Sequence, residues 1–298
     1  MPRLLNSRRL ITIIADGKTL HIPPGGWTSH TFARDGERMI FTLQRLAKIT
    51  QRRAWGGIAK AVNTIFLRQL REVIERATRH TAAVVAGAKV GFAFDQHEGL
   101  WLQAMNEVFA ETGLDIATTI GPNLQSIMAQ GYSKTSLLLG HGEAPTMNAT
   151  IARAARGLAN EVTAVNATTR DNIANSVRRS IADGLNVAET AARLEAEVPP
   201  ILSNRALTIA RTETSNAWND GAARSFQESD TLTHVSVIGC EAREKSSPQW
   251  KGESTCNFAD VKITDLDEFL KVGFHPNHTG NLIPSRFRNA DGTVEAIE

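Results

Sequence analysis

The sequence predicts a mainly α-helical protein with a small β-containing part near its C-terminus. Three observations indicate this fold class. Apolar residues recur at three- and four-residue spacing over most of the chain. Alanine is abundant while aromatic residues make up only 6% of the chain, which favours helices that pack closely through small side chains. The alternation typical of strands is found in two short segments, near residues 11–22 and 232–239.

The first segment, residues 1–35, is predicted to be a β-hairpin arm. The run "RRLITIIADGKTLHI" reads as two short strands around Asp16-Gly17, a dipeptide that favours a tight turn. The "PPGG" that begins at Pro23 then ends regular structure. Because an isolated hairpin is only marginally stable in water, we expect it to pack on its own domain or on a neighbour.

Residues 36–146 are predicted to form a basic helical region. A helical pattern extends from about Glu37 to Arg79, and the pair Gly56-Gly57 is expected to break or bend it. A helix with many cations and few anions can contact phosphates, although a solvated face that keeps a protein soluble has the same composition. The candidate contacts to DNA or to an acidic partner are Arg45, Lys48, Arg52, Arg53, Lys60, Arg68 and Arg71.

The small net charge of +2 conceals a strong asymmetry along the chain. Residues 1–90 hold 16 Lys/Arg and 5 Asp/Glu, so the remaining residues hold 17 and 26 respectively. Such a distribution suggests that one end faces a polyanion or an acidic partner. The alternative is that the two halves neutralise each other within the fold.

Further helices are expected along the middle of the chain. They are predicted near residues 95–112, 122–139 and 147–183, with breaks at Gly113, Gly121-Pro122 and "GHGEAP". The segment "NVAETAARLEAEV" is predicted to form another helix. We expect Pro199-Pro200 to stop it, because proline lacks an N–H and its ring clashes with the preceding turn.

The segment "SNRALTIARTETSNAWNDGAARSF" is predicted to be the next helix, with Ser203 or Asn204 as its N-cap. Its packing stripe consists mostly of small side chains, which would let a neighbouring backbone approach closely. Trp218 is its one large anchor. The stripe comprises Leu207, Ala210, Thr214, Trp218 and Gly221. After Gln227 we expect a strand at "LTHVSVIG", then mostly loop with a short helix at "TDLDEFLKVG".

Two charged residues of this helix raise a structural question. Arg211 and Glu213 stand two positions apart, and an α-helix turns about 100° per residue, so their side chains leave nearly opposite faces. The two cannot pair with each other. A buried arginine needs acceptors, and a buried carboxylate needs donors or a cation. Each residue must therefore meet a different neighbouring element.

The order of these signals resembles the head morphogenesis (minor head protein) domain of tailed bacteriophages, in the Mu-like, portal-associated family. The family pattern has a helix with a glycine-containing turn, here Asp183-Gly184, and then a helix bearing Ala-Arg-Thr-Glu, here Ala210 to Glu213. A β-segment and a late histidine-proline turn follow, here His275-Pro276. The resemblance covers about half the chain, and we place the corresponding domain at residues 147–298.

The resemblance implies a minor capsid protein with no catalytic activity. It would lie in the interior of the virion head or at the portal vertex, after assembly in the host cytoplasm, and assist DNA packaging or ejection. The implied partners are the portal protein, capsid or scaffold proteins, and double-stranded DNA bound without sequence preference. No membrane partner is expected, because no stretch of about 18 apolar residues occurs. Arg211, Glu213 and Trp218 would then form a structural signature that braces adjacent elements.

An enzyme is the alternative function. An arginine and a glutamate on one helix could belong to an ADP-ribosyltransferase-like toxin, and the C-terminal Cys, His and Glu groups could serve a metal-dependent hydrolase. The serine-threonine strand motif and the glutamate pair that a transferase would need are not visible in the sequence. We therefore expect the signature to be structural.

The C-terminal cysteines and histidines form a candidate zinc site. Many relatives in the resembled family have a cysteine pair followed by histidine-proline-x-cysteine-x-cysteine, whereas this chain has "HPNHTGN". Two thiolates and two imidazoles suffice for tetrahedral zinc. The two cysteines are sixteen residues apart, which is unlike a C-x-x-C knuckle, so two ordinary thiols and two hydrogen-bonded histidines are the alternative. The four candidate ligands are Cys240, Cys256, His275 and His278.

Overall fold

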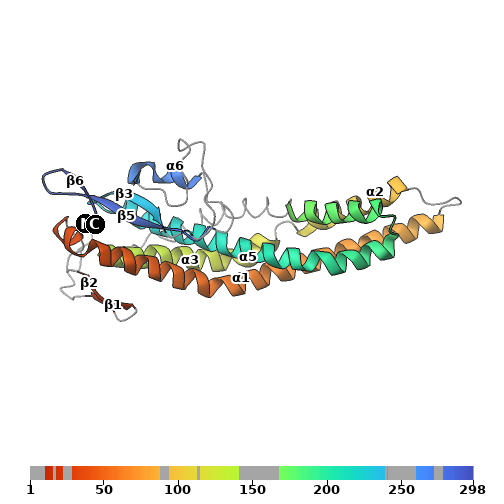
Figure 1. Cartoon of the computed structure of the whole chain (residues 1–298), viewed down its shortest axis with the longest axis horizontal. Helices are drawn as coiled ribbons and strands as arrows, with labels where there is room; N and C mark the ends of the chain where they lie inside the picture. Colours follow the sequence, from red (N-terminus) through yellow and green to blue (C-terminus); the bar gives the residue numbers. More distant parts are fainter. Residues whose placement is uncertain are drawn as a thin grey trace, which may run out of the picture. The chain divides into compact units, whose positions relative to one another are not determined.

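A computed structural model describes most of the chain, namely residues 11–15, 18–22, 29–87, 94–112, 115–140, 168–238, 240, 260–271 and 278–297. The protein is mainly helical and carries a small antiparallel sheet near its C-terminus, as the sequence predicts (Figure 1). No helix in the described ranges is both long enough and apolar enough to cross a membrane.

The chain folds into two compact units, each assembled from separate stretches. The first unit comprises Met1–Trp55, Asn123–Ala154 and Ile209–Glu298, and the second comprises Gly56–Pro122 and Ala155–Thr208. Three helices contribute residues to both units. They are α1 (Ser29–Gly87), α3 (Asp115–Leu139) and α5 (Val187–Gln227). The domain boundary expected near residue 146 does not coincide with a boundary between these units.

The predicted N-terminal hairpin is confirmed. Strand β1 (Ile11–Ala15) pairs antiparallel with β2 (Lys18–Ile22) on either side of Asp16-Gly17, which itself lies outside the described residues. The register places Ile11 opposite Ile22. Directly opposed residues share one face of an antiparallel pair, so the apolar alternation of the two strands is in register.

Helix α1 runs without interruption through Gly56-Gly57, so this pair, which was predicted to break or bend the helix, does not break it. Both glycines are exposed, and a Cβ at either position would meet nothing within 4 Å. A helical glycine costs about 1 kcal/mol relative to alanine. The buried face continues on both sides, since Ala47 and Val62 are fully buried. Packing of this buried face outweighs the low helix preference of the two glycines. The pair does lie where the chain passes from the first unit to the second.

Helix α3 likewise continues through Gly121-Pro122, so the prediction of a break at this pair is wrong. The helix α2 (Phe94–Thr112) precedes α3, and the break predicted at Gly113 lies outside the described residues. Proline removes one backbone hydrogen bond, but Gly121 has no Cβ to clash with the proline ring. Ile120 and Leu124 are buried on either side of the pair, and their burial keeps the helix continuous.

Helix α5 is a single helix, so Pro199-Pro200 do not stop it and neither Ser203 nor Asn204 is its N-cap. Leu194, Val198 and Leu202 are buried at four-residue spacing across the proline pair, and this packing holds the helical register. The true N-cap is Asn186. Its Oδ1 accepts the Glu189 N–H at 3.0 Å and its own N–H donates to Glu189 Oε2 at 2.8 Å, which is a capping box.

The turn before α5 is also as predicted. Residues 168–182 are helical, and the remainder of the predicted 147–183 helix up to residue 167 lies outside the described residues. Gly184 then adopts a φ of +78°, and its N–H donates to the Ile181 carbonyl. A left-handed residue of this kind ends a helix at little cost only when it is glycine.

The C-terminal part of the first unit is a four-stranded antiparallel sheet in the order β4-β3-β5-β6. The predicted strand is β3 (Leu232–Ile238), and the predicted short helix appears as the 3-10 turn η2 (Ile263–Asp265) and α6 (Leu266–Lys271). Three strands were expected to be loop, which is wrong. These are β4 (Val261–Lys262), β5 (Asn281–Arg288) and β6 (Val294–Ala296).

Strand β5 is hard to recognise because it contains a proline. Pro284 lies opposite Val235 of β3, at a point where the register of the β3–β5 pair shifts. Proline has no N–H to donate to the ladder, and irregularities of this kind are where sheets tolerate it. The apolar residues Leu282 and Phe287 of the same strand are buried.

Helices α3 and α5 approach each other closely through glycine, as the lean stripe of α5 predicts. A Cβ at Gly221 would lie 2.1 Å from the Met128 carbonyl oxygen, and one at Gly131 would lie 2.5 Å from the Trp218 carbonyl oxygen. Neither side chain could be added without moving a backbone. Trp218 is fully buried and forms the large anchor of the stripe.

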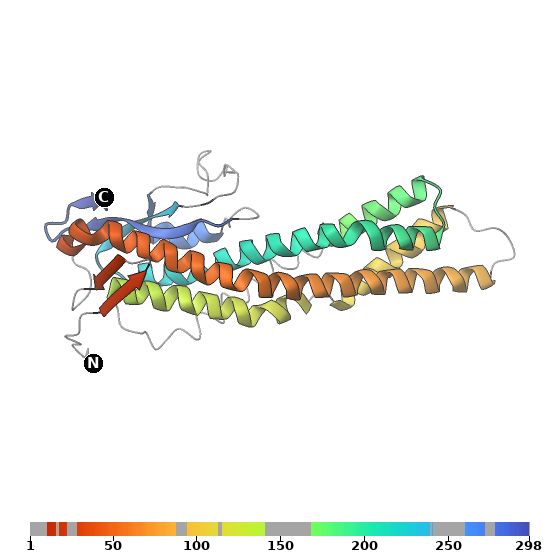
Figure 2. The ribbon, with the colours of Figure 1, turned by 60° about the horizontal axis from the view of Figure 1, so that its bottom comes forward.

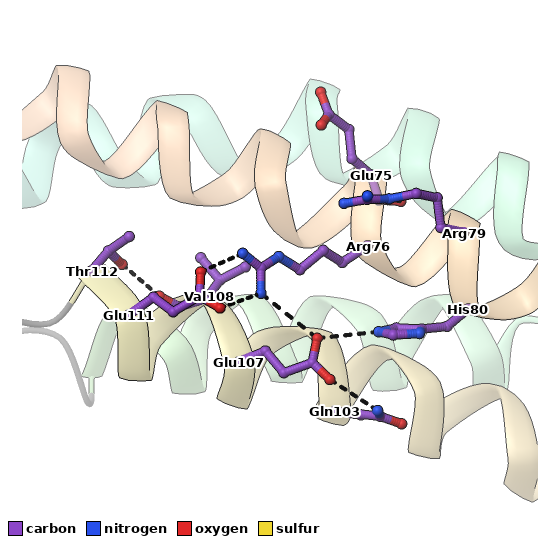
Figure 3. A network of polar contacts seen from close by, with 9 residues as sticks. All are labelled: Glu75, Arg76, Arg79, His80, Gln103, Glu107, Val108, Glu111 and Thr112. Atoms are coloured by element: carbon purple, nitrogen blue, oxygen red, sulfur yellow. Dashed lines mark hydrogen bonds and ion pairs between the residues drawn. The ribbon is translucent and has the colours of Figure 1, made fainter.

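In the second unit, α1 and α2 are joined at the surface by a network of charged side chains (Figure 3). Arg76 Nη1 donates to Glu111 Oε1 at 2.8 Å, and His80 Nε2 lies 3.2 Å from Glu107 Oε2. The hydrogen bond from Arg76 lowers the pKa of Glu111. The pKa of Glu107 is also lowered, first by a hydrogen bond from Gln103 and then by one from His80.

We predict that Gly221→Ala destabilises the protein, whereas Gly57→Ala does not. The new methyl at position 221 must displace the α3 backbone, which should cost about 1–3 kcal/mol or more. At position 57 it enters open space and should raise stability by about 0.5–1 kcal/mol. Urea denaturation followed by circular dichroism measures both. Equal effects of the two substitutions would contradict the close helix contact.

We predict that the stabilisation from the Arg76–Glu111 pair is lost in acid. A carboxyl group with a lowered folded-state pKa stabilises the fold above its unfolded value, here 4.5, and loses that contribution as pH falls through the folded value. Arg76→Met should therefore lower the urea midpoint slightly at pH 7, since the pair is exposed, and the difference from wild type should shrink as the pH falls below 4.5.

Arg79→Met is the matched control for this experiment. Among the described residues, Arg79 makes one side-chain hydrogen bond, from its Nε to the Glu75 carbonyl of its own helix at 3.4 Å. This variant should show the same difference from wild type at every pH. A difference between wild type and Arg76→Met that is independent of pH would count against the ion pair.

Candidate functional site: a buried polar junction on α5

Arg211 and Glu213 leave opposite faces of α5 within the first unit. The guanidinium carbon of Arg211 lies 5.4 Å from the centroid of the Trp55 ring on α1, within the range of a cation–π contact. Glu213 is 5% exposed. Arg211 thus meets α1, whereas Glu213 is buried.

Trp55 forms a second contact with α5. Its indole Nε1 donates to Thr214 Oγ1 at 2.7 Å, and the same hydroxyl donates to the Ala210 carbonyl one turn earlier, also at 2.7 Å. Thr214 is fully buried, so its hydroxyl needs these partners. The Trp55 side chain of α1 thus contacts both Arg211 and Thr214, which lie about one turn apart on α5.

The next polar residues along α5 hold the segment that enters β5. Ser215 Oγ and Asn219 Nδ2 both donate to the Gly280 carbonyl, at 3.0 and 3.1 Å. Asn219 Oδ1 accepts the N–H of Leu282 at 2.9 Å. The Asn219 side chain therefore hydrogen-bonds both a backbone carbonyl and a backbone N–H of the segment that enters β5. Ser215, Asn219, Gly280 and Leu282 are all buried.

A further hydrogen bond links α1 to the same segment. Gln51 Nε2 donates to Asn281 Oδ1 at 2.8 Å, although the two residues are 230 positions apart in the sequence. Both are almost fully buried. Three distant parts of the chain are thus held together, and we call this set the polar junction. It consists of Gln51, Trp55, Arg211, Thr214, Ser215, Asn219, Gly280, Asn281 and Leu282.

The polar junction holds secondary-structure elements in place. Neutral hydrogen bonds between buried side chains and backbone groups fix the relative positions of α1, α5 and β5, and leaving any of them unmade in a buried site is costly. Arg211 contacts Trp55 of α1, and Ser215 and Asn219, which follow it on α5, hold the segment that enters β5.

Trp218 borders the polar junction on the α3 side. The ammonium of Lys134 lies 5.8 Å from the centroid of the Trp218 ring, and its Nζ donates to Thr50 Oγ1 at 2.8 Å. Burial lowers the pKa of Lys134, and the positive charge of Arg53 adds to this effect. Nearby on α3, burial and a hydrogen bond to Glu228 raise the pKa of Tyr132 to about 12.

The candidate zinc ligands are only partly described. Cys256 and His275 lie outside the described residues, so the four-ligand set stays a prediction. His278 is fully buried, and its ring lies against Gly280, where a Cβ would come within 2.8 Å of His278 Cε1. Cys240 is half-buried. In the part of the chain that the structure describes, no three His, Cys, Asp or Glu side chains are grouped so as to hold a metal ion.

The predicted DNA or portal contacts all lie on α1 but differ in exposure. Arg45 and Lys48 are half-buried, whereas the other five residues are exposed. Arg68 pairs with Asp115 of α3 and more weakly with Glu72. The α1 sequence from Arg38 to Arg71 contains no Asp or Glu, so most of these cations have no counter-ion on their own helix.

Several residues of the polar junction were not singled out from the sequence. Gln51, Trp55 and Asn281 carry no local signal, because their partners are far away in the chain. A signal did exist on α5. Arg211, Ser215 and Asn219 follow one another at four-residue spacing, and a polar row of this kind on a helix otherwise lined by alanine indicates buried hydrogen bonding.

Comparisons with known proteins leave the function to be argued from these contacts. No family model, no curated protein and no solved structure matches the chain.

We predict that Asn219→Ala destabilises the protein more than Ser215→Ala. The first change leaves the Leu282 N–H without its acceptor and removes one donor from the Gly280 carbonyl, which should cost about 2–4 kcal/mol. The second leaves Asn219 still donating to that carbonyl, so a cost of about 1 kcal/mol is expected. Urea denaturation measures both free energies, and the reverse order would contradict the junction.

Proposed function

We propose that this protein is a minor head protein of a tailed bacteriophage, which acts in head morphogenesis near the portal and assists DNA packaging or ejection. One observation carries the proposal. The helix that bears Ala210 to Glu213 is hydrogen-bonded, through Ser215 and Asn219, to the segment that follows His275-Pro276. In the resembled family pattern that helix likewise precedes the histidine-proline turn.

The physical character of the polar junction supports a structural role. Its described hydrogen bonds join side chains to one another or to backbone groups, and they hold together segments that are far apart in the sequence. An assembly component needs segments fixed in this way. An enzyme site would instead present polar groups toward a substrate. We accordingly propose that Arg211 and Trp218 hold the fold and perform no chemical step.

The exposed cations of α1 support the proposal that the protein binds a polyanionic or acidic partner within the particle. Arg53, Lys60 and Arg71 are exposed, and no ion pair joins them to another described residue. Packaged double-stranded DNA would be contacted through its phosphates, without sequence preference and with a strong dependence on salt. An acidic surface of the portal, capsid or scaffold proteins is the other partner that we propose.

The position of the protein in purified particles tests this function. We predict that quantitative mass spectrometry of intact phage heads detects the chain in few copies, and that it remains with the portal vertex when heads are disassembled. A portal-free preparation of capsid shells serves as the control and should lack it. Absence from heads, together with NAD-consuming or hydrolytic activity of the purified protein, would overturn the proposal in favour of an enzyme.

A further inference from the structure

A small surface of mixed character lies where α1 and α3 meet in the first unit. The two helices run side by side there (Figure 2), and Lys134 Nζ of α3 donates to Thr50 Oγ1 of α1 at 2.8 Å. Arg53 follows Thr50 by one helical turn, and Leu137 follows Lys134 by the same interval. We call this surface the α1–α3 seam. It consists of Ile49, Arg53, Lys134 and Leu137.

The seam exposes apolar side chains that the fold leaves uncovered. Ile49 is 37% exposed and Leu137 is 39% exposed, although both belong to helices whose other large apolar residues are mostly buried. At about 100° per residue, Ile49 and Arg53 both lie on the flank of α1 that borders Thr50, away from the buried Gln51. The apolar and cationic side chains are therefore neighbours on one surface.

The two helices that form the seam bring no negative charge to it. Neither helix contributes a carboxylate near it, because α1 has no Asp or Glu from Arg38 to Arg71 and α3 has none from Ile116 to Leu139. Among the described residues, Lys134 contacts a hydroxyl, an amide oxygen and an indole ring, but no carboxylate. Arg53 likewise has no ion pair with a described residue.

Lys134 is the unusual member of this set. Its ammonium is half-buried and has Arg53, another cation, as a charged neighbour. Burial is the larger cause that lowers the pKa of Lys134, and the positive charge of Arg53 is the smaller one. Both disfavour the charged form of the lysine. A carboxylate placed against Lys134 and Arg53 would supply the counter-ion that both cations lack among the described residues and would offset the repulsion between them.

The geometry points to the α1–α3 seam as a docking site for an acidic amphipathic helix of a partner protein. We propose that its apolar residues, spaced three and four apart, cover Ile49 and Leu137 while its carboxylates pair with Arg53 and Lys134. The inference rests on charge complementarity and exposure alone, and it does not depend on the proposed phage function.

A protein partner fits the seam better than DNA does. A phosphate backbone is neutralised by cations and gains nothing from Ile49 or Leu137, whereas protein interfaces combine an apolar centre with charged residues at the rim. The longer row of exposed cations on α1 remains available to DNA, because Lys60 and Arg71 lie outside the seam.

Fluorescence polarisation with a labelled synthetic peptide tests the docking site. The probe is a helical peptide with leucine at positions i, i+3, i+4 and i+7 and glutamate at most others, and a scrambled peptide of the same composition is its control. The full-length protein should bind the first and not the second. We expect Arg53→Gln with Lys134→Gln to weaken binding about tenfold, and Leu137→Ser alone to weaken it about fivefold.

Matched variants elsewhere separate the seam from general effects. Lys262→Gln removes an exposed cation on β4, and Ile201→Ser removes an apolar side chain that is 41% exposed on α5. Neither should change the affinity for the peptide. Arg53→Gln alone keeps the test valid if changes at Lys134 disturb folding, because Arg53 is exposed.

Three results would overturn the docking site. The first is that wild-type protein binds both peptides equally or neither of them. The second is that Lys262→Gln or Ile201→Ser weakens binding as much as the seam variants. The third is that a duplex DNA probe binds at the seam, with binding lost in Arg53→Gln and unchanged in Leu137→Ser, which would make the surface a phosphate contact.

Discussion

The first unit depends on one hydrogen-bonded contact, in which Ser215 and Asn219 of α5 hold the backbone at Gly280 and Leu282. This contact fixes where β5 begins, and β5 is the strand on which both β3 and β6 pair. Because the groups are buried, losing them would leave polar backbone atoms without water or partner. Strand β5 is therefore positioned by residues of a helix that lie about 60 positions earlier in the sequence.

Close packing and polar bonding act together on α5. Gly221 of α5 and Gly131 of α3 let the two backbones come into contact, which leaves no room for a side chain at either position. The polar side chains Thr214, Ser215 and Asn219 then supply specificity, since each bond requires a particular partner at a particular position. Arg211 of the same helix contacts the Trp55 ring of α1. Helix α5 therefore contacts α1, α3 and β5.

The elements of this fold are largely predictable from the sequence, but its interruptions and its polar contacts are not. Hydrophobic spacing predicted the helices, and Asp16-Gly17 predicted the hairpin. Gly56-Gly57, Gly121-Pro122 and Pro199-Pro200 were expected to end helices and do not, because burial of flanking residues outweighs a local cost of about 1–3 kcal/mol. The Gln51–Asn281 bond spans 230 positions, and no local pattern predicts such a contact.

Amide hydrogen exchange at Leu282 tests most directly whether α5 braces the sheet. Its N–H donates to the Asn219 side chain in a buried site, so it should exchange as slowly as the amides paired between β3 and β5. Exchange at the rate of an exposed turn, such as the one at Gly292, would show that the bond between α5 and the entry of β5 does not persist in solution, and would contradict this account.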